Sequence, residues 1–319
     1  MNNLLKRVIV AGGGGFIGRA LCGALLAGGY QVVVLTRGPS RNPSAHPDGL
    51  QPIIVNWDGR TSRGWGHLAD GAFALVNLAG ENIAQGRWTP KRKQDIVESR
   101  VLPGLAMLQA AREASVRPEV YVQASAVGFY GDTGAEVVDE ASPPGRGFLS
   151  RVCLDVEAST REMEAVVARR VVIRTGLVLG RGGGALQKMV MPFKLFLGGP
   201  FGNGRQGFPW IHLDDVTGAI VFLLESAEAS GPYNLTAPEG VSNLEFCRHL
   251  GRALSRPCWL AVPPAALRLM FGEMAEELFL TGCRAAPRRL MDMGYAFRHP
   301  GLAEALAALF SRTRPANSN

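Results

Sequence analysis

The 319-residue sequence lacks the features that mark membrane-spanning, disulfide-bonded and nucleic-acid-binding proteins. It has no run near the ~18 apolar residues that a membrane span needs. Its five cysteines are scattered and odd in number, with no C-x-x-C pair, which predicts reduced and mostly buried thiols. It has no run of five or six basic residues and no basic stripe interleaved with aromatics. Despite a net charge of +7, we therefore expect no nucleic-acid partner.

Histidine is sparse as well. The five histidines show no ligand spacing with one another or with cysteine, so no metal site is predicted. The chain enters a predicted strand almost at once, which leaves no room for a signal peptide. A cytoplasmic location is therefore expected.

Short apolar segments alternate with helical segments through the first half of the chain. Continuous apolar strands of this kind are typical of a parallel sheet that is covered on both faces. The right-handed crossover rule then predicts an α/β fold with a doubly wound, Rossmann-type sheet. The predicted strands are residues 8–11, 31–35, 53–55, 74–76, 120–122 and 171–173, and the predicted helices are 16–27, 91–114 and 149–168.

The pattern changes after about Gly180, where two glycine-rich segments appear and the later residues become mostly helical. Within this second half, residues 213–236 have the pattern of a return to the sheet. We therefore predict a dinucleotide-binding domain of residues 1–181, joined by that return segment. A smaller, mostly helical substrate domain is predicted for residues 182–212 and 237–312.

Gly12, Gly15 and Gly18 form a G-x-x-G-x-x-G pattern directly after the first predicted strand and at the start of the first helix. In such a loop one glycine permits the tight turn, one lets the backbone approach a pyrophosphate, and one allows close packing of helix on sheet. The pyrophosphate lies at the helix N-terminus, where free N–H groups and the dipole favour an anion. The pattern therefore predicts a dinucleotide site.

The end of the second predicted strand indicates which dinucleotide is bound. An acidic residue there would bond the ribose 2′-hydroxyl of NAD, but this chain has Arg37, which can pair with the 2′-phosphate of NADP. We therefore favour NADP(H). Two more loops follow predicted strands: small residues at Ala79 and Gly80 let adenosine approach the backbone, and Asp58 either contacts adenine or serves as an ordinary turn residue.

Several segments resemble the extended short-chain dehydrogenase/reductase superfamily, namely GGGGFIG (12–18), NLAGEN (77–82) and SAVGFYG (125–131). More narrowly, the chain is similar to the atypical NAD(P)-dependent epimerase branch, which has its own C-terminal domain, in RTGLVLGRGGGA (174–185), PWIH (209–212) and PRRL (287–290). The resemblance covers nearly the whole chain and implies an NADP(H) site. Besides the three glycines, the residues expected there are Phe16, Ile17, Thr36, Arg37, Asp58, Leu78, Ala79, Gly80, Asp95, Arg100 and Val178.

The catalytic pattern of the superfamily is absent from this chain. That pattern is a Tyr-x-x-x-Lys pair, in which the tyrosine transfers a proton and the lysine lowers its pKa. Alignment on Glu157 puts Leu149 at the tyrosine position and Cys153 at the lysine position, and leucine cannot transfer a proton. The replacement candidates are Cys153 as a thiol acid, Ser125, and Tyr130 at the mouth of the nicotinamide loop. A strand-end serine and a small buried cysteine are the alternative interpretations.

A glycine-rich segment at 202–210 resembles the loop that grips the distal part of the substrate in extended members of the superfamily. On that basis Arg205, which suits a phosphate or carboxylate, Trp210 and His212 are expected on the substrate side. His212 could titrate near neutrality, although a role in capping a helix is the commoner explanation for such a segment.

Together these features predict an NADP(H)-dependent oxidoreductase or epimerase-like enzyme with a non-standard acid/base group. The alternative is a catalytically inactive NADP(H)-binding regulatory or redox-sensing protein, which the missing tyrosine and lysine favour. We expect a small-molecule substrate, polar or anionic, no membrane partner, and a monomer or homodimer.

Overall fold

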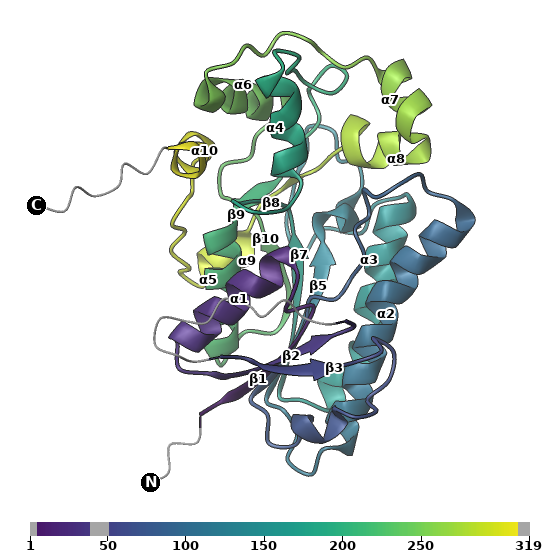
Figure 1. The fold of residues 1–319 in the computed structure, drawn as a ribbon, viewed down its shortest axis with the longest axis vertical. Coiled ribbons are helices and arrows are strands. Elements are labelled where there is room, and N and C mark those ends of the chain that lie inside the picture. The colour runs from purple at the N-terminus through teal and green to yellow at the C-terminus, as the bar shows by residue number, and fades with distance from the viewer. Residues whose placement is uncertain (1–4, 39–50, 312–319) are drawn as a thin grey trace, which may run out of the picture.

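A parallel seven-stranded sheet occupies the centre of the molecule (Figure 1). The structure is a computed structural model that describes residues 5–38 and 51–311. The predicted end of the helical substrate domain, at residue 312, therefore lies outside the described residues. The strands of the sheet are β1 (Arg7–Ala11), β2 (Gln31–Thr36), β3 (Ile53–Asn56), β4 (Ala74–Asn77), β5 (Val120–Ala126), β7 (Arg169–Thr175) and β10 (Gly231–Leu235). Their order is β10-β7-β5-β4-β1-β2-β3, which confirms the predicted doubly wound sheet.

Four helices cover the two faces of the sheet, α1 (Phe16–Ala27), α2 (Pro90–Glu113), α3 (Phe148–Ser159) and α5 (Leu213–Glu225). The helices α1 and α5 lie together on one face, and α2 and α3 lie on the other (Figure 1). A hydrophobic core lies on each face of the sheet, and successive strand residues point into opposite cores. Val8 of β1 packs on the α1 side, and Ile9 packs on the α2 side. Burial on both faces explains why these strands are continuously apolar.

The helix predicted at residues 149–168 is shorter in the structure. The helix α3 ends at Ser159, and a 3-10 segment (Arg161–Ala165) follows it. Thr160 between them is fully buried, and its hydroxyl accepts a hydrogen bond from Arg170 of β7 at 3.2 Å. This side-chain bond holds the chain against the sheet and ends the helix, which helical periodicity alone could not predict.

The helices α4 (Leu186–Lys194), α6 (Asn243–Leu254), α7 (Pro264–Phe271) and α8 (Glu273–Ala275) gather at one end of the molecule, at the top of Figure 1. The helix α10 (Leu302–Phe310) packs against α6, and α9 (Arg288–Asp292) packs against β10. Shorter 3-10 segments are Gly66–Ala69 and Val127–Tyr130, and a π-helical turn spans Glu276–Leu280. Among the described helices, none combines the length and apolar character that crossing a bilayer requires.

Two short parallel pairs of strands connect the sheet to the helical part. The strand β8 (Leu177–Leu179) pairs with β9 (Trp210–His212), and β6 (Val137–Val138) pairs with β11 (Arg284–Ala285). The segment from α5 to β10 returns to the sheet, where β10 pairs with β7. The order of the sheet reverses at β1, which lies between β2 and β4. In doubly wound folds, ligands bind beyond the carboxyl ends of the strands at such a switch point.

Candidate functional site

The loop between β1 and α1 brings backbone atoms so close together that only glycine fits. Gly12 has a φ of +77°, and its carbonyl oxygen accepts a hydrogen bond from the Gly15 N–H at 2.9 Å. A Cβ atom on Gly18 would lie 2.2 Å from that same oxygen. The helix α1 begins after Gly15 with no side-chain cap and no acidic residue in its first turn, so its N-terminus is open to an anion. This cradle fits the pyrophosphate of a dinucleotide.

A cleft of about 770 Å³ extends from this loop past the carboxyl ends of β2 and β3 to the side of α2. The sequence-predicted residues that line it are Gly12, Gly15, Thr36, Arg37, Asp58, Leu78, Ala79, Gly80 and Asp95. Sequence reasoning missed Arg19, Trp57 and Arg60, which line the same cleft. Arg19 and Arg60, together with Arg37, place three arginine side chains along the first cleft, an arrangement suited to a phosphorylated ligand.

Asp58 shapes the wall of this cleft through a turn. Its carboxylate accepts hydrogen bonds from the backbone N–H groups of Arg60 (2.8 Å) and Thr61 (2.9 Å) and from the Thr61 hydroxyl (2.7 Å). The bond from Arg60 N–H, followed by that from Thr61, lowers the pKa of Asp58. Of the two roles left open by the sequence, the turn role is the one observed, and the turn carries the Arg60 side chain, which pairs with Glu98 at 3.1 Å.

Asp95 and Arg100, which the resemblance placed together at the cofactor, face different clefts. Asp95 lines the first cleft and pairs with Lys91 at 2.6 Å. Arg100 lies against Gly80 and donates to the carbonyl oxygens of Ile96 (3.0 Å) and Glu81 (2.8 Å). Its guanidinium lines a second cleft instead, and burial lowers the pKa of Arg100.

Four residues that were predicted to hold the cofactor line neither cleft. The ring of Phe16 packs against Gly180, Gly183 and Gly184, where added Cβ atoms would lie 2.5–2.9 Å from it. Ile17 packs against the apolar core and Val178 lies within it. Gly18 lies behind the turn, against Gly12. The side chains of Phe16, Ile17 and Val178 therefore pack behind the loop, whereas the backbone N–H groups of Phe16 and Ile17 belong to the open N-terminus of α1.

The second cleft, of about 550 Å³, lies at the carboxyl ends of β5 and β7 and the start of α3. It shares Leu78, Ala79 and Gly80 with the first cleft, so the two meet. Its walls are largely apolar and include Leu149 and Phe208. A long ligand that starts at the glycine loop would therefore end in an apolar pocket.

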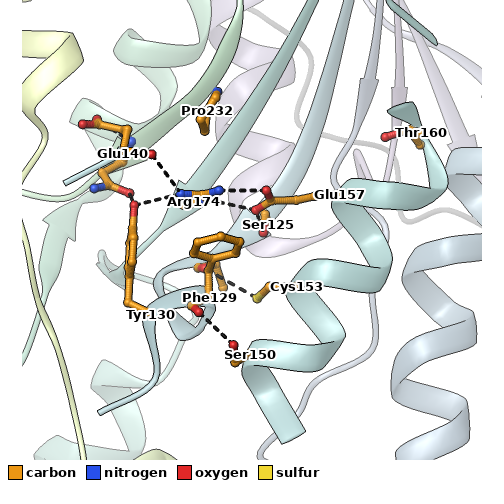
Figure 2. Close-up of polar contacts among 12 residues, drawn as sticks. Ser125, Phe129, Tyr130, Glu140, Ser150, Cys153, Glu157, Thr160, Arg174 and Pro232 are labelled. Carbon is orange, nitrogen blue, oxygen red and sulfur yellow. Dashed lines mark hydrogen bonds and ion pairs between the residues drawn. The ribbon is translucent and has the colours of Figure 1, made fainter. Parts of the chain in front are cut away.

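Ser125 lines the second cleft and belongs to a buried polar network (Figure 2). Its hydroxyl donates to Glu157 Oε1 at 2.8 Å. Glu157 in turn receives two bonds from Arg174, each 2.9 Å long, so the carboxylate is gripped at both oxygens. The guanidinium carbon lies 3.4 Å from the centre of the Phe129 ring, which fixes the arginine in place. The serine is therefore the point where this network reaches the cleft.

Tyr130 is part of the same network but does not reach the cleft. Its side chain is buried, and its hydroxyl donates to Asn234 Oδ1 at 2.7 Å and accepts from Arg174 at 3.0 Å (Figure 2). Burial raises the pKa of Tyr130. The predicted place at the mouth of the nicotinamide loop is thus not where the side chain points, because the polar partners inside the fold hold it there.

Cys153 and Leu149 line the second cleft side by side with Ser125, as their alignment with the missing pair implied. The thiol of Cys153 is 3.5 Å from the Ala126 carbonyl oxygen, to which it donates. Burial raises the pKa of Cys153, so the thiol stays protonated near neutral pH. It can pack against a ligand but is a weak proton donor.

The three residues expected on the substrate side do not line either cleft. Arg205 is exposed on the loop after Asn203. Trp210 is buried, and its indole N–H donates to the Glu239 carbonyl at 3.2 Å. His212 caps α5 by accepting a hydrogen bond from the Asp214 N–H at 3.1 Å. The distal wall is formed instead by residues 207–209, which belong to the predicted substrate loop at 202–210, and by residues 276–283. Sequence reasoning missed the second of these segments, because it lies far along the chain from the strand ends.

Glu277 is the most consequential of the missed residues. Its carboxylate accepts hydrogen bonds from the backbone N–H groups of Phe148 (2.6 Å) and Leu149 (2.7 Å). A carboxylate at a helix N-terminus is favourable, so this contact ties the helical part to α3 across the second cleft. Only the fold brings Glu277 to α3, and no local sequence signal indicates the contact.

Comparison with known proteins finds two family models that match successive segments of the chain. Residues 8–236 match the NAD dependent epimerase/dehydratase family, and residues 262–309 match a domain of unknown function (DUF1731). The first match ends directly after β10, the last strand of the seven-stranded sheet, and the second lies within the mostly helical C-terminal part.

Individual relatives match along almost the whole chain. Epimerase family protein Mb2239 of Mycobacterium bovis is 40% identical over 309 residues, covering 97% of this chain and 98% of the relative. The human epimerase family protein SDR39U1 is 36% identical over 303 residues, with 94% and 98% covered. A crystal structure of human SDR39U1 (isoform 2) with NADPH superposes with a TM-score of 0.84 at 34% identity, covering 95% of this chain and 99% of that one.

Proposed function

The chain belongs to the NAD dependent epimerase/dehydratase family, and from this premise we propose that it is an NADP(H)-dependent oxidoreductase or epimerase-like enzyme acting on a small organic molecule. The observation that carries the proposal is the junction of the two clefts at Leu78, Ala79 and Gly80. One cleft begins at a phosphate cradle, and the other ends at Ser125 in an apolar pocket.

The residues of the first cleft fit NADP(H). The Gly12–Gly18 loop would hold the pyrophosphate, and Arg37 and Arg60 would hold the 2′-phosphate. The human relative whose structure contains NADPH supports this assignment. When bound, the nicotinamide of such a cofactor supplies or accepts a hydride.

The second cleft favours a substrate that is mainly apolar. Its charged lining residues are the cations Arg100 and Arg146 and the carboxylates Asp132, Glu276 and Glu277. Because the two signs nearly balance and Arg100 is committed to backbone carbonyls, no strong preference for an anion follows. A neutral alcohol or carbonyl compound is the substrate class that this lining fits best.

In this proposal Ser125 handles the proton. Its oxygen can accept the proton of a substrate alcohol while its own hydrogen passes to Glu157 Oε1, 2.8 Å away. For reduction the protons move in the opposite sense. Arg174 keeps Glu157 in the geometry that receives the serine proton and is a positioning residue, since it does not line the cleft.

A second candidate function is an NADP(H)-binding protein without hydride chemistry. Two residues that line the second cleft favour this candidate. At the positions of the superfamily's proton-transferring tyrosine and its lysine, this chain has the apolar side chain of Leu149 and the protonated thiol of Cys153. Tight NADPH binding with no NADPH oxidation across a broad panel of carbonyl compounds would support this candidate and overturn the enzyme proposal.

The Arg37→Asp variant is expected to weaken NADPH binding by about 10- to 100-fold, because a bond between charged groups is replaced by a repulsion. NADH, which lacks the 2′-phosphate, should be affected much less. The measurement is titration of each cofactor by its fluorescence.

The matched control for Arg37→Asp is Arg117→Asp, which makes the same change of charge. Arg117 is exposed and precedes β5, at the amino ends of the strands, whereas the clefts lie at the carboxyl ends. Equal losses for NADPH and NADH in Arg37→Asp, or a similar loss in Arg117→Asp, would contradict a 2′-phosphate contact.

The Ser125→Ala variant is expected to lower kcat by about 10- to 100-fold, with NADPH affinity unchanged, because only proton transfer is lost. The assay follows the loss of NADPH absorbance with a substrate found in the carbonyl panel. Ser159→Ala serves as the control. Ser159 is the last residue of α3, the helix that also carries Glu157, and its hydroxyl bonds to the backbone of that helix without lining the cleft. Full activity in Ser125→Ala would remove the serine from the mechanism.

A further inference from the structure

His299 comes together with His212 and Asp214 outside both clefts, although it lies more than 80 residues further along the chain. The two imidazole rings have centroids 3.8 Å apart and are tilted by 41°. One carboxylate oxygen lies between them: Asp214 Oδ2 is 3.5 Å from His212 Nδ1 and 3.4 Å from His299 Nε2. The proposed function assigns no role to these groups.

The two distances from Asp214 Oδ2 to the histidine nitrogens match the spacing of neighbouring ligand atoms in a tetrahedral metal site. Zinc bonds to histidine nitrogen and carboxylate oxygen of about 2.0–2.2 Å place neighbouring ligand atoms about 3.3–3.6 Å apart in a tetrahedron. The three side chains offer ligand atoms that all lie within 4.8 Å of one another. We propose that His212, Asp214 and His299 bind a divalent transition-metal ion of the zinc type, with water as the fourth ligand.

The hydrogen bonding of His212 shows which ring nitrogen carries the lone pair that would bind the metal. Because Nδ1 accepts the Asp214 N–H at 3.1 Å, the ring proton lies on Nε2 and the lone pair lies on the nitrogen that faces the carboxylate. A metal would replace this amide as the partner of Nδ1. The amide stands at the solvent-facing start of α5, beside an Asp214 side chain that is 53% exposed, so water can take over its hydrogen bond.

His299 is held in position by a separate set of bonds. Both oxygens of the fully buried Asp215 accept backbone N–H groups, from Arg298 at 2.7 Å and from His299 at 2.9 Å. The Tyr295 hydroxyl donates to the Asp215 carbonyl at 3.1 Å. A second shell that fixes the backbone of a ligand in this way lowers the cost of assembling the site.

The cluster is also open to an ion and to the water ligand. The side chain of His299 is 19% exposed, whereas that of His212 is 7% exposed. The buried imidazole forms the floor, and the other two side chains form the rim. A bound ion would join the segment before α10 to the start of α5, and it would do so without contacting either cleft.

The test uses the full chain without an affinity tag, stripped of metal, and titrated with Zn²⁺ by calorimetry. Wild-type protein should bind one Zn²⁺, and Zn²⁺ should raise its Tm because only the folded chain forms the site. The His299→Ala variant should bind at least about 100-fold more weakly, since even outer-shell partners of metal ligands are worth about 10- to 100-fold. Co²⁺ bound to wild-type protein should show the intense visible absorption of four-coordinate cobalt.

Asp214→Asn provides a second variant on the exposed rim, whereas substitution of His212 would also remove the cap of α5 and is avoided. The exposed His67 gives the control His67→Ala, which should bind as wild type does. NADPH affinity should be the same with and without Zn²⁺. Zn²⁺ binding that is equally strong in His299→Ala and wild type, or six-coordinate cobalt spectra in both, would overturn the proposal and leave a carboxylate bridging two imidazoles.

Discussion

Replacing Arg174 with alanine is expected to destabilise the protein by about 3–5 kcal/mol, the range for breaking a buried ion pair by removing one partner. Arg174 is 5% exposed and supplies both bonds to Glu157, one to the Tyr130 hydroxyl, and a face to the Phe129 ring. Without it, the Glu157 carboxylate, only 15% exposed, would keep its charge with one serine bond left. Urea denaturation measures the loss.

The comparison for Arg174→Ala is Arg112→Ala, which also removes one arginine from a pair with a glutamate. That pair is exposed, at 50% and 71% for Arg112 and Glu162, so its loss should cost less than about 1 kcal/mol. An Arg174→Lys variant should fall between wild type and Arg174→Ala, since lysine keeps the charge but cannot grip both oxygens. Equal midpoints for Arg174→Ala and Arg112→Ala would mean that water solvates Glu157 and that the network adds little stability.

A Gly18→Ala substitution is expected to weaken NADPH binding by about 1,000-fold, or about 4 kcal/mol. The new Cβ would lie 2.2 Å from Gly12 O and 2.7 Å from Gly13 Cα, and backbone atoms cannot swing aside as a side chain can. The turn at Gly12 must then open, which moves the N–H groups that form the cradle. Fluorescence titration with NADPH gives the affinity, and circular dichroism shows whether the fold is retained.

The matched control for Gly18→Ala is Gly23→Ala, in the same helix. A Cβ at Gly23 meets nothing within 4 Å, so this change should leave NADPH affinity intact. It should also stabilise the protein by about 0.5–1 kcal/mol, because alanine is the better helix former. Retained NADPH affinity in Gly18→Ala would show that the loop does not hold the cofactor through this turn.

The parts of the fold that follow from local pattern were predictable. Apolar runs gave the strands, and the spacing of Gly12, Gly15 and Gly18 gave the loop, because strand burial and tight turns restrict residue type directly. The end of α3 was not predictable, since Thr160 stops the helix through a bond to Arg170 of a later strand. Helical periodicity contains no trace of that contact.

The candidate site also has one part that could be predicted from the sequence and another that could not. The cofactor end lies on loops next to predicted strands, so Arg37 and Asp58 could be named in advance, and Asp95 on the facing side of α2 came from the family resemblance. The part of the distal wall at residues 276–283 could not be named, because it reaches the cleft only through the packing of the C-terminal helical part. The motif around Trp210 and His212 indicated substrate contact, but the indole and imidazole are held inside by Glu239 and Asp214. The approach of His212 and His299 to the same Asp214 oxygen could likewise not be predicted from their spacing in the sequence.

The buried carboxylate of Asp215 has a consequence for how the chain comes apart. It belongs to α5, yet both its oxygens are satisfied by the backbone at 298–299. Glu140 makes a similar bridge, between the N–H groups of Asn234 and Arg289. If the C-terminal segment detached, the Asp215 and Glu140 carboxylates would lose these N–H partners while still buried, at a free-energy cost of several kcal/mol each. The two parts are therefore expected to unfold in one cooperative transition, and a fragment that stops at β10 should fail to fold.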